Sequence, residues 1–502
     1  MNNGSFTEKR IHIALLVLAA VIFALFSINT NIWFDECYSL AAVSHDISEL
    51  PGVLMDDVHP FLYYFMLKAV SVVCGGSLIA MRLFSALGMW LLCLAGYTHI
   101  RRYISPRMGL FFSLFCCLSP AGVKYAAEIR MYSFGALFVF FSAFYAYLAA
   151  ESSFKSRKDC ILFVIFSVAA AYMHYYGLVT VCVINVFFIV GAVIKKAKAL
   201  PVVACAASEL LLYIPGFIVF LTQSTRVAAG DYWIQVKYPD VILQTMSYAF
   251  TGGDSYWDTY MSKPAFVAVC AVGCVLFALA AYAAIRGAKK KKKEALAAVL
   301  ALGVFCGVVV LGLAVSVFKE FYYVRYSMLP CGLLLAVYAY AASEIHKKQL
   351  VAGLCAVLSA VFAAVTVPHL IAVHNGDFGR VRDSLNEAFD EDDILVFGRL
   401  TPGSVVSYML DGGRQYFVNS KIDDYPRAYT AFEPDIVTVP DFESLPDSVE
   451  GKIWLLVQDS NEDLLVAGLE SRYPTAEVAD VVEYSVLYRH NNFKFIVYTL
   501  EG

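Results

Sequence analysis

The sequence is poor in charged residues, and its cysteines follow no functional spacing. Only 16% of its 502 residues are Asp, Glu, Lys or Arg, and 60% are hydrophobic, whereas soluble domains are about a quarter charged and about half apolar. The 13 cysteines include no CxxC pair and no Cys/His set with the spacing of zinc ligands, so neither a disulfide framework nor a zinc site is predicted. The low charge predicts an integral membrane protein.

The few charges are unevenly distributed, which predicts a domain boundary. Residues 377–502 contain 24 acidic and 10 basic residues, a net charge of −14, whereas the remainder contains 18 acidic and 28 basic residues, a net charge of +10. We therefore predict a membrane domain over residues 1–375 and an acidic soluble domain over residues 376–502. The basic residues form short clusters between apolar runs rather than a continuous patch, so no nucleic-acid partner is predicted.

Eleven apolar runs predict a polytopic α-helical membrane protein, because a membrane-spanning helix needs roughly 20 apolar residues. The first run follows Lys9 and Arg10 and has no small-residue cleavage site after it, so we interpret it as an uncleaved signal anchor. The run over 61–73 is shorter and is either a twelfth span or an interfacial segment. The predicted spans are residues 11–29, 78–99, 108–123, 131–150, 160–174, 177–194, 199–221, 264–285, 295–318, 326–343 and 350–373.

Positive charges predict the orientation of the chain, because short cytoplasmic loops retain Lys and Arg. If residues 61–73 do not cross the membrane, 19 of the 28 basic residues before residue 377 face the cytoplasm. The N-terminus is then cytoplasmic, and the C-terminal domain is extracytoplasmic. The polar loops that would share the outer face are residues 30–60, 124–132, 174–176, 222–263 and 319–325.

Two adjacent carboxylates follow the first predicted span, in the segment Trp33-Phe34-Asp35-Glu36. Carboxylates at a membrane boundary are costly unless they are paired or solvated, so Asp35 and Glu36 are candidates for a catalytic site. The alternative is structural, because Asp is also well suited to cap a helix N-terminus that faces water.

Two further acids and a histidine precede the short run over 61–73. Pro60 suits the first turn of a helix, and acidic residues before it suit the helix dipole, but neither reason requires His59. We regard His59 as a candidate for positioning substrate. Asp56 and Asp57 are candidate ligands of Mg²⁺ or Mn²⁺, because such cations prefer oxygen ligands.

A third polar segment contains Lys124, Glu128, Arg130 and Tyr132. Arginine is the preferred partner of phosphate oxygens, because its planar guanidinium donates two parallel hydrogen bonds. An arginine at a membrane interface can also extend its guanidinium to lipid headgroups without any catalytic role.

His174 lies between two predicted spans, and Lys319 and Arg325 precede the tenth. Their tyrosine neighbours are typical of an aromatic belt at a membrane interface, which accounts for the tyrosines but not for the histidine or the arginine. Glu209 lies within the predicted span 199–221, and an acid there is either functional or hydrogen-bonded to a neighbouring helix.

The order of these segments resembles that of the polytopic GT-C glycosyltransferases, in particular the branch of protein O-mannosyltransferase-like and lipid A aminoarabinose transferase-like proteins. A first span is followed by WFDE-Y, HP-FLYY, E-R-MYS, H-YYG and YYVRY segments, in that order, and then by a soluble tail. The resemblance covers roughly residues 10–375, and the order of the motifs is more specific than any motif alone. The family often has HPP where this chain has His59-Pro60-Phe61.

The resemblance implies a membrane glycosyltransferase that takes a sugar from a polyprenyl phosphate at the outer face and transfers it to an extracytoplasmic protein, glycan or lipid. Asp35 occupies the position of the family's catalytic carboxylate and would be the base of an inverting displacement, with Glu36 beside it. The candidates for binding the donor phosphate are Arg130, Arg325, Lys124 and Lys319, and those for positioning sugar or acceptor are His59, Glu128, Tyr132 and His174. Members of the family differ in their metal dependence.

A transporter or flippase of lipid-linked sugars is the main alternative function. Such proteins carry charges inside their spans, near the membrane midplane, whereas this sequence concentrates its charges in the predicted outer loops and has Glu209 in mid-span. A third alternative is a receptor or assembly subunit that acts through its soluble tail.

The C-terminal domain is predicted to be α/β, because strand-like runs alternate with helical ones. It contains no Gly-rich phosphate loop and no obvious catalytic triad. The predicted strands are residues 393–397, 435–439, 453–457, 478–482 and 494–498, and the predicted helices are 379–389, 402–410 and 460–471.

Overall fold

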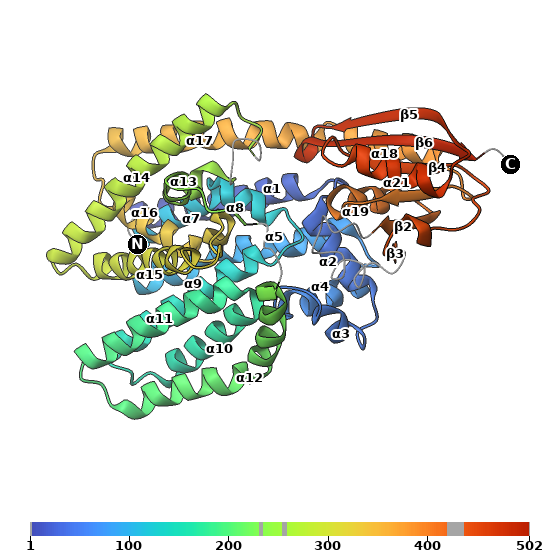
Figure 1. Cartoon of the computed structure of the whole chain (residues 1–502). Coiled ribbons are helices and arrows are strands. Elements are labelled where there is room, and N and C mark those ends of the chain that lie inside the picture. The colour runs from blue at the N-terminus through green and yellow to red at the C-terminus, as the bar shows by residue number, and fades with distance from the viewer. Residues whose placement is uncertain (1–2, 230–233, 254–258, 419–435, 501–502) are drawn as a thin grey trace. The chain divides into compact units, whose positions relative to one another are not determined.

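The computed structural model describes residues 3–229, 234–253, 259–418 and 436–500 (Figure 1). Contacts divide the chain into two compact units, which we describe separately. The helical unit comprises Met1–Ile28, His59–Ser224 and Tyr232–Leu370, and the sheet unit comprises Asn29–Val58, Thr225–Asp231 and Ile371–Gly502. The sheet unit therefore includes the segment that follows the first helix as well as the C-terminal residues.

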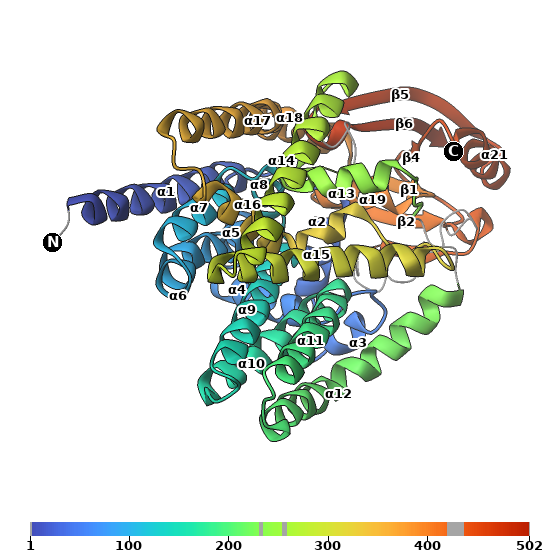
Figure 2. The same ribbon diagram turned by 90° about the vertical axis from the view of Figure 1, so that its left-hand side faces the viewer.

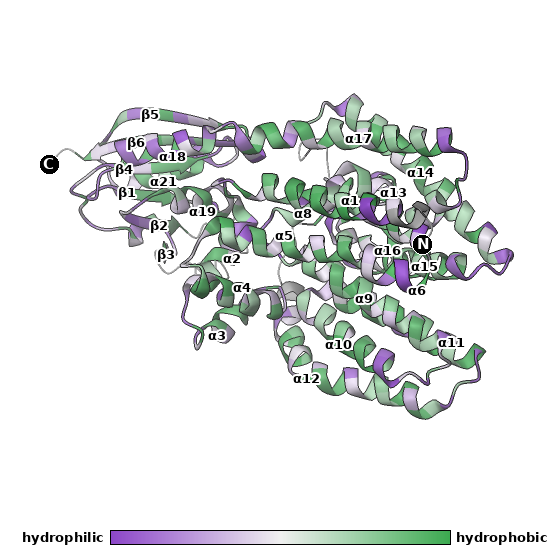
Figure 3. Ribbon diagram, turned by 180° about the vertical axis from the view of Figure 1, so that it is seen from behind, coloured by the Kyte–Doolittle hydropathy of each residue, from purple (hydrophilic) through white to green (hydrophobic). Residues whose placement is uncertain are grey.

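The helical unit consists of helices joined by short connections, and Figure 3 shows hydrophobic residues along most of the length of α11 and α12. Helices α12 and α17 end in residues that belong to the sheet unit. The helices are α1 (Asn3–Ser27), α4 (Leu62–Val73), α5 (Leu78–Ala95), α6 (Arg101–Tyr103), α7 (Pro106–Cys117), α8 (Pro120–Ala126), α9 (Tyr132–Glu151), α10 (Arg157–Met173), α11 (Tyr175–Ile194), α12 (Ala199–Ala229), α13 (Asp240–Thr251), α14 (Lys263–Lys289), α15 (Lys293–Ser316), α16 (Cys331–Ser343) and α17 (Lys348–His374), with a π-helical turn η1 (Gly96–Ile100) and a 3-10 helix η3 (Val324–Met328).

The eleven predicted spans fall on helices, although 108–123 covers both α7 and α8, and 326–343 covers both η3 and α16. This confirms a polytopic α-helical membrane protein. By length and composition, eight helices among the described residues can cross a membrane, or nine if the bent pair α7 and α8 counts as one span. Helices α4 and α16 are apolar but shorter. The number of eleven spans stays a prediction.

The predicted span 108–123 is wrong in one respect, because it is broken into α7 and α8 with a bend of 62°. The break has a local cause. Pro120 is in the first turn of α8 and has no N–H to continue the ladder of α7. The Ser119 hydroxyl caps α8 by accepting a hydrogen bond from the Gly122 amide at 3.2 Å, and it donates to the Ala249 carbonyl at 2.9 Å.

The predicted polar loop over 222–263 is partly helical, because α12 continues into it and α13 lies within it. Figure 2 shows α13 beside α14. The two helices approach closely, since a Cβ on Gly273 would lie 2.6 Å from the Ser247 Cβ. Helix α13 ends at Gly252, whose φ of 68° favours glycine. Residues 230–233 and 254–258 of the predicted loop lie outside the described residues.

The C-terminal part of the sheet unit is an α/β domain, as predicted. Among the described residues, its sheet has six strands in the order β3-β2-β1-β4-β6-β5, in which β1 to β4 are parallel and β6 is antiparallel to β4 and β5. The elements of the whole unit are α2 (Phe34–Ser44), α3 (Leu50–Leu54), α18 (Asp377–Ala388), β1 (Ile394–Phe397), α19 (Leu400–Met409), β2 (Arg414–Val418), β3 (Ile436–Val439), η4 (Phe442–Ser444), β4 (Ile453–Val457), α21 (Glu462–Arg472), β5 (Ala476–Val486), η5 (Tyr488–His490) and β6 (Asn491–Leu500).

The predicted strands and helices of this domain all coincide with observed elements, although residue 435 lies outside the described residues. Strand β2 was missing from the prediction. It begins with the polar pair Arg414-Gln415, so its sequence does not read as an apolar strand. The preceding Gly412-Gly413 is a turn signal from which a following strand could have been predicted. Strands β1 and β4 are buried at every residue, as expected for the centre of a parallel sheet covered on both faces.

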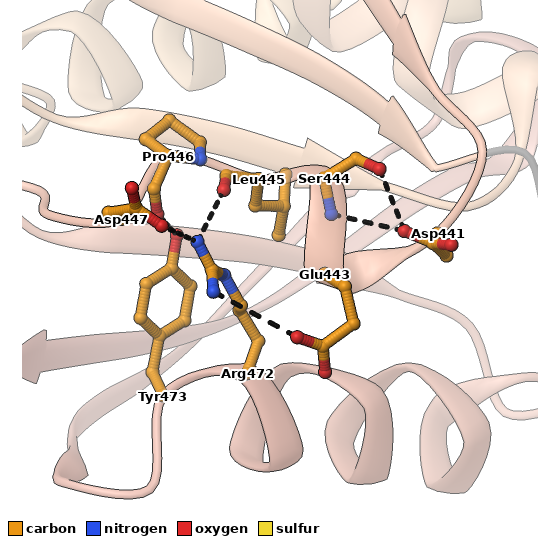
Figure 4. A network of polar contacts seen from close by, with 8 residues as sticks. All are labelled: Asp441, Glu443, Ser444, Leu445, Pro446, Asp447, Arg472 and Tyr473. Atoms are coloured by element: carbon orange, nitrogen blue, oxygen red, sulfur yellow. Dashed lines mark hydrogen bonds and ion pairs between the residues drawn. The ribbon is translucent and has the colours of Figure 1, made fainter.

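Buried polar groups tie the connections to this sheet. Asp393, which is 1% exposed, accepts hydrogen bonds from the Trp454 indole at 2.8 Å and the Lys452 amide at 2.7 Å. Figure 4 shows a second network at the end of α21. There the Arg472 guanidinium donates to the Leu445 carbonyl at 2.8 Å, and the Tyr473 hydroxyl donates to the Pro446 carbonyl at 2.6 Å.

Candidate functional site

The two predicted catalytic carboxylates lie in the first turn of α2, in the sheet unit. Trp33 is the N-cap residue, so the alternative in which Asp35 caps this helix is wrong. Asp35 and Glu36 occupy the following turn, where the helix dipole favours negative charge. Glu36 is buried and Asp35 is half-buried, so Asp35 is the more accessible of the two.

The C-terminal domain holds α2 through contacts inside the sheet unit. Helix α2 packs against α19, and the Cys37 thiol donates to the Ser404 carbonyl at 3.7 Å. The Arg489 guanidinium carbon lies 3.9 Å from the centre of the Trp33 ring, a distance typical of a cation–π contact. The residues on either side of Asp35 are therefore fixed by residues several hundred positions later in the sequence.

Asp56 and Asp57, the predicted metal ligands, follow α3 in the sheet unit. Asp57 is buried and Asp56 is half-buried. Within the described ranges of the chain, no group of three or more His, Cys, Asp and Glu side chains is placed to hold a metal ion.

In the helical unit, three predicted residues from separate polar segments lie together. The Arg130 guanidinium donates to the His59 imidazole at 3.3 Å and to the Tyr64 hydroxyl at 3.4 Å. The His59 ring centre lies 5.5 Å from that of His174. We call His59, Arg130, His174 and Arg325 the histidine–arginine cluster, because Arg325 immediately precedes Tyr326, whose ring centre lies 5.1 Å from that of His174.

His174 has a defined protonation state in this cluster. It caps α11, since its Nδ1 accepts a hydrogen bond from the Tyr176 amide at 2.9 Å. Burial is the main cause that lowers the pKa of His174 well below 6.5, and the neighbouring side chains of His59, Arg130 and Arg325 lower it further. A neutral ring whose Nδ1 accepts must carry its proton on Nε2. In the described part of the chain, this Nε2 has no hydrogen-bond partner, so it can donate to a ligand.

Aromatic rings and further charges surround the histidine–arginine cluster. Lys124, Glu128 and Arg130 are each less than 5% exposed. The Tyr132 ring lies 5.7 Å from the His174 ring and 5.0 Å from the Tyr125 ring, and the Lys124 amine lies 5.4 Å from the latter. The segment 124–132 therefore brings two cations and one carboxylate to the cluster, which favours an anionic ligand.

The two predicted cations before α16, Arg325 and Lys319, differ in burial. Arg325 is half-buried, with its guanidinium carbon 5.3 Å from the Tyr323 ring centre. Lys319 is exposed, and the neighbouring Glu320 accepts a hydrogen bond from the Val236 amide at 3.3 Å. Arg325 is therefore the more enclosed of the two predicted cations.

Sequence reasoning missed several residues of this region. Gln223 is buried, donates to the His59 carbonyl at 3.2 Å and accepts from the Tyr175 hydroxyl. The Tyr326 ring lies 4.4 Å from Tyr176 and 5.1 Å from His174. Arg82, within the predicted second span, is 1% exposed. A charge inside an apolar run is a functional signal, and this signal was available in the sequence.

Glu209 forms a separate polar pair in the helices. Its carboxylate accepts a hydrogen bond from the Asn185 side-chain amide at 2.7 Å, which links α12 to α11. This contact supports the structural reading of Glu209, in which it hydrogen-bonds a neighbouring helix.

Comparison with known proteins gives a match in structure but not in sequence. No family model and no curated protein sequence matches the chain. The crystal structure of ArnT from Cupriavidus metallidurans in the apo state aligns with a TM-score of 0.54 at 13% identity and covers 97% of both chains. The same protein bound to undecaprenyl phosphate aligns with a TM-score of 0.50 at 14% identity over 96% of this chain and 97% of its own.

A third solved structure, the Archaeoglobus fulgidus oligosaccharyltransferase in complex with Zn and sulfate, aligns with a TM-score of 0.47 at 9% identity over 96% of this chain and 73% of its own. ArnT is a lipid A aminoarabinose transferase, and both proteins are GT-C glycosyltransferases. The two ArnT alignments span nearly the whole chain, including the C-terminal sheet domain. This chain therefore has the fold of the GT-C glycosyltransferases, as the order of its motifs predicted.

Proposed function

We propose that this protein is a membrane glycosyltransferase that transfers a sugar from a polyprenyl-phosphate donor to an extracytoplasmic acceptor. The observation that carries the proposal is the GT-C fold over 97% of the chain. The histidine–arginine cluster and the carboxylates of α2 add the two kinds of group that such a reaction needs, a holder for a phosphate and a base.

The donor is proposed from the chemistry of the cluster and from the neighbour in structure. ArnT has been solved with undecaprenyl phosphate, a lipid whose head is a phosphate. Arg130 and Arg325 would bind the donor phosphate here, with Lys124 and Lys319 as further cations. Preorganised cations stabilise the negative charge that develops on a leaving phosphate.

The proposed reaction is a displacement at the anomeric carbon of the sugar. Asp35 takes the proton of the acceptor hydroxyl, whose oxygen forms a bond to the anomeric carbon with inversion. The bond from that carbon to the phosphate oxygen breaks, and its electron pair leaves with the polyprenyl phosphate. This leaving group is stable as an anion, so no general acid is required. Glu36, buried beside Asp35, would strengthen it as a base through its negative charge.

The remaining predicted residues would position the sugar or the acceptor. The Nε2 proton of neutral His174 can donate to a sugar hydroxyl or a phosphate oxygen, and His59, Glu128 and Tyr132 supply further polar groups. Asp56 and Asp57 stay candidate ligands of Mg²⁺ or Mn²⁺, and no step is assigned to a metal. If EDTA abolishes transfer and Mg²⁺ or Mn²⁺ restores it, this result would support Asp56 and Asp57 as metal ligands.

An in vitro transfer assay tests the proposal. The purified protein is given radiolabelled polyprenyl-phosphate sugars, with a cell-envelope extract as acceptor, and donor binding is measured in parallel. We expect Asp35→Asn to reduce transfer about a thousandfold or more at unchanged donor binding, because the neutral amide of asparagine cannot take the proton of the acceptor hydroxyl. Arg130→Gln should instead weaken donor binding, since it removes a cation.

Two exposed positions provide matched controls. Asp46→Asn changes an exposed acid in the same segment as Asp35, and Arg157→Gln changes an exposed arginine at the start of α10. Both variants should retain transfer. If Asp35→Asn is as active as Asp46→Asn, then Asp35 is not the base.

The alternative function is movement of a lipid-linked sugar across the membrane, and it is suggested by Glu209 within a predicted span. Reconstitution in proteoliposomes distinguishes this movement from transfer of the sugar to an acceptor. A wild-type protein that moves labelled donor lipid but transfers no sugar, and that loses this activity in Glu209→Gln, would replace the glycosyltransferase proposal with a flippase.

A further inference from the structure

An apolar cavity lies in the helical unit. It is lined mainly by α9 from Phe140 onward, by the second half of α11 and by the first half of α15, with residues of η1, α7 and α16, and its volume is about 260 Å³. Figure 1 shows α11 beside both α9 and α15. Helix α9 begins at Tyr132, which contacts the cluster, and ends at Glu151, which lines the cavity. The lining of α9 begins at Phe140, about 12 Å along the helix from Tyr132, and continues to Glu151 at the other end of the helix. The end of the cavity at Glu151 is therefore distinct from the cluster.

The cavity opens where the helices face lipid. Val190, Ile194 and Leu296 line it and are nevertheless 48%, 74% and 43% exposed. Exposed apolar side chains on a membrane-spanning helix contact the hydrocarbon of the bilayer. A lipid chain can therefore enter the cavity sideways, without passing through water.

The rim of the cavity carries more positive than negative charge. Glu151 lies between two lysines, with Lys195 at 2.9 Å and Lys293 at 3.6 Å. Both amines are partly exposed, and the two loops that follow α11 and α14 add the lysines of segments 195–198 and 289–293. Such a cluster attracts the anionic headgroups of lipids.

A buried hydroxyl points to the nature of the ligand. Tyr147 lies one helical turn before Glu151, lines the cavity and is 9% exposed. Among the described residues, its hydroxyl has no hydrogen-bond partner. A buried donor without a partner is unfavourable, so a ligand with an acceptor at this depth would be stabilised.

We propose that this cavity binds one acyl chain of an anionic glycerophospholipid. The phosphate would lie at Lys195 and Lys293, the ester carbonyl would accept a hydrogen bond from Tyr147, and the acyl chain would fill the apolar part. The order of phosphate, ester and chain in such a lipid matches the order of these groups from the rim inward. A polyprenyl phosphate carries no ester carbonyl and would leave Tyr147 unsatisfied, so the site differs from the proposed donor site.

Native mass spectrometry of the full-length protein, purified in detergent, tests this proposal. The added lipids are phosphatidylglycerol, phosphatidylcholine, an ether-linked phosphatidylglycerol without ester carbonyls, and undecaprenyl phosphate. We expect one phosphatidylglycerol to be retained at concentrations at which phosphatidylcholine is not. Ala297→Trp, which fills the cavity, should abolish this retention, and Tyr147→Phe should weaken it about fivefold by removing one hydrogen bond.

The ether-linked lipid should bind the wild type as weakly as phosphatidylglycerol binds Tyr147→Phe. Ala207→Trp and Tyr282→Phe, at exposed positions of α12 and α14, are the matched controls and should change nothing. If Ala297→Trp does not fold, Tyr147→Phe decides alone. Retention of phosphatidylglycerol that neither variant alters would overturn the proposal, and so would retention of undecaprenyl phosphate alone in the same cavity.

Discussion

His174 shows how a single buried side chain can make the whole protein sensitive to pH. Its Nδ1 accepts a hydrogen bond from the Tyr176 amide, and this bond is possible only while Nδ1 is unprotonated. The neighbouring arginines make protonation still less favourable. The same hydrogen bond and neighbouring charges that leave the Nε2 proton available for substrate also make the neutral ring the favoured form in the folded state.

We therefore predict that stability falls as the pH is lowered below about 6.5. The pKa of His174 is depressed in the folded state, so the unfolded chain binds a proton between 6.5 and that lower value while the folded chain does not. The expected slope is about 1.4 kcal/mol per pH unit. Thermal midpoints of the purified protein from pH 7.5 to 5 would measure it.

His174→Asn should remove this component, because an asparagine can still cap α11 but does not titrate. His346→Asn, at an exposed position, is the matched control and should retain the slope. Identical slopes in the wild type and in His174→Asn would contradict the assignment.

At the scale of elements, small residues set the distance between helices that carry the cluster. A Cβ on Gly88 of α5 would lie 2.8 Å from the Phe134 amide nitrogen of α9. The Ser133 hydroxyl donates to the Ser85 carbonyl at 2.5 Å, and the Ser85 hydroxyl bonds the Tyr63 hydroxyl at 2.7 Å. Helices α4, α5 and α9 are thereby joined directly beside Tyr64, which contacts Arg130.

We predict that Gly88→Ala destabilises the protein by about 1–3 kcal/mol, because the added methyl group meets backbone atoms that cannot rotate away. Gly353→Ala, on α17, where a Cβ would have no atom within 4 Å, is the control and should be neutral or slightly stabilising. Thermal unfolding in detergent compares the two. Equal midpoints would show that α5 and α9 separate at little cost.

The contact between Trp33 and Arg489 gives the C-terminal domain a role in positioning α2. We predict that Arg489→Ala lowers kcat about tenfold or more while donor affinity is unchanged, since small displacements of a base cost much activity. Arg489→Lys should recover part of the loss, because an ammonium can also lie over the indole ring. Arg414→Ala, at an exposed position of β2, is the control. A changed donor affinity with normal kcat would exclude this positioning role.

For the whole molecule, the sequence predicted the class of fold and most elements, because hydrophobic runs and charge segregation are local signals. The break before Pro120 and helix α13 were missed, since the first lies inside an apolar run and the second inside a polar stretch. The grouping of His59, Arg130 and His174 followed from placing their loops on one face. The packing of α2 on α19 could not be predicted, because the sequence of a helix does not indicate which distant segment it contacts.

The orientation of the chain stays a prediction from charge. We expect alkaline phosphatase fused after Gly502 to be active, because that end would lie outside the cytoplasm, and the same enzyme fused within residues 289–293 to be inactive. A fluorescent protein that matures only in the cytoplasm should give the reverse pattern. Activity at both positions, or the opposite pair of results, would overturn the predicted topology.

The contact between Cys37 and Ser404 joins residues 367 positions apart, and this separation has a consequence in time. At roughly 5–20 residues per second, a ribosome needs about 20–70 s to make the intervening chain. The helix that carries Asp35 is thus synthesised early but lacks its packing partner until nearly all of the protein has been translated and inserted. A chain truncated by premature termination would therefore contain the proposed base without the support that orients it, so incomplete products would be inactive.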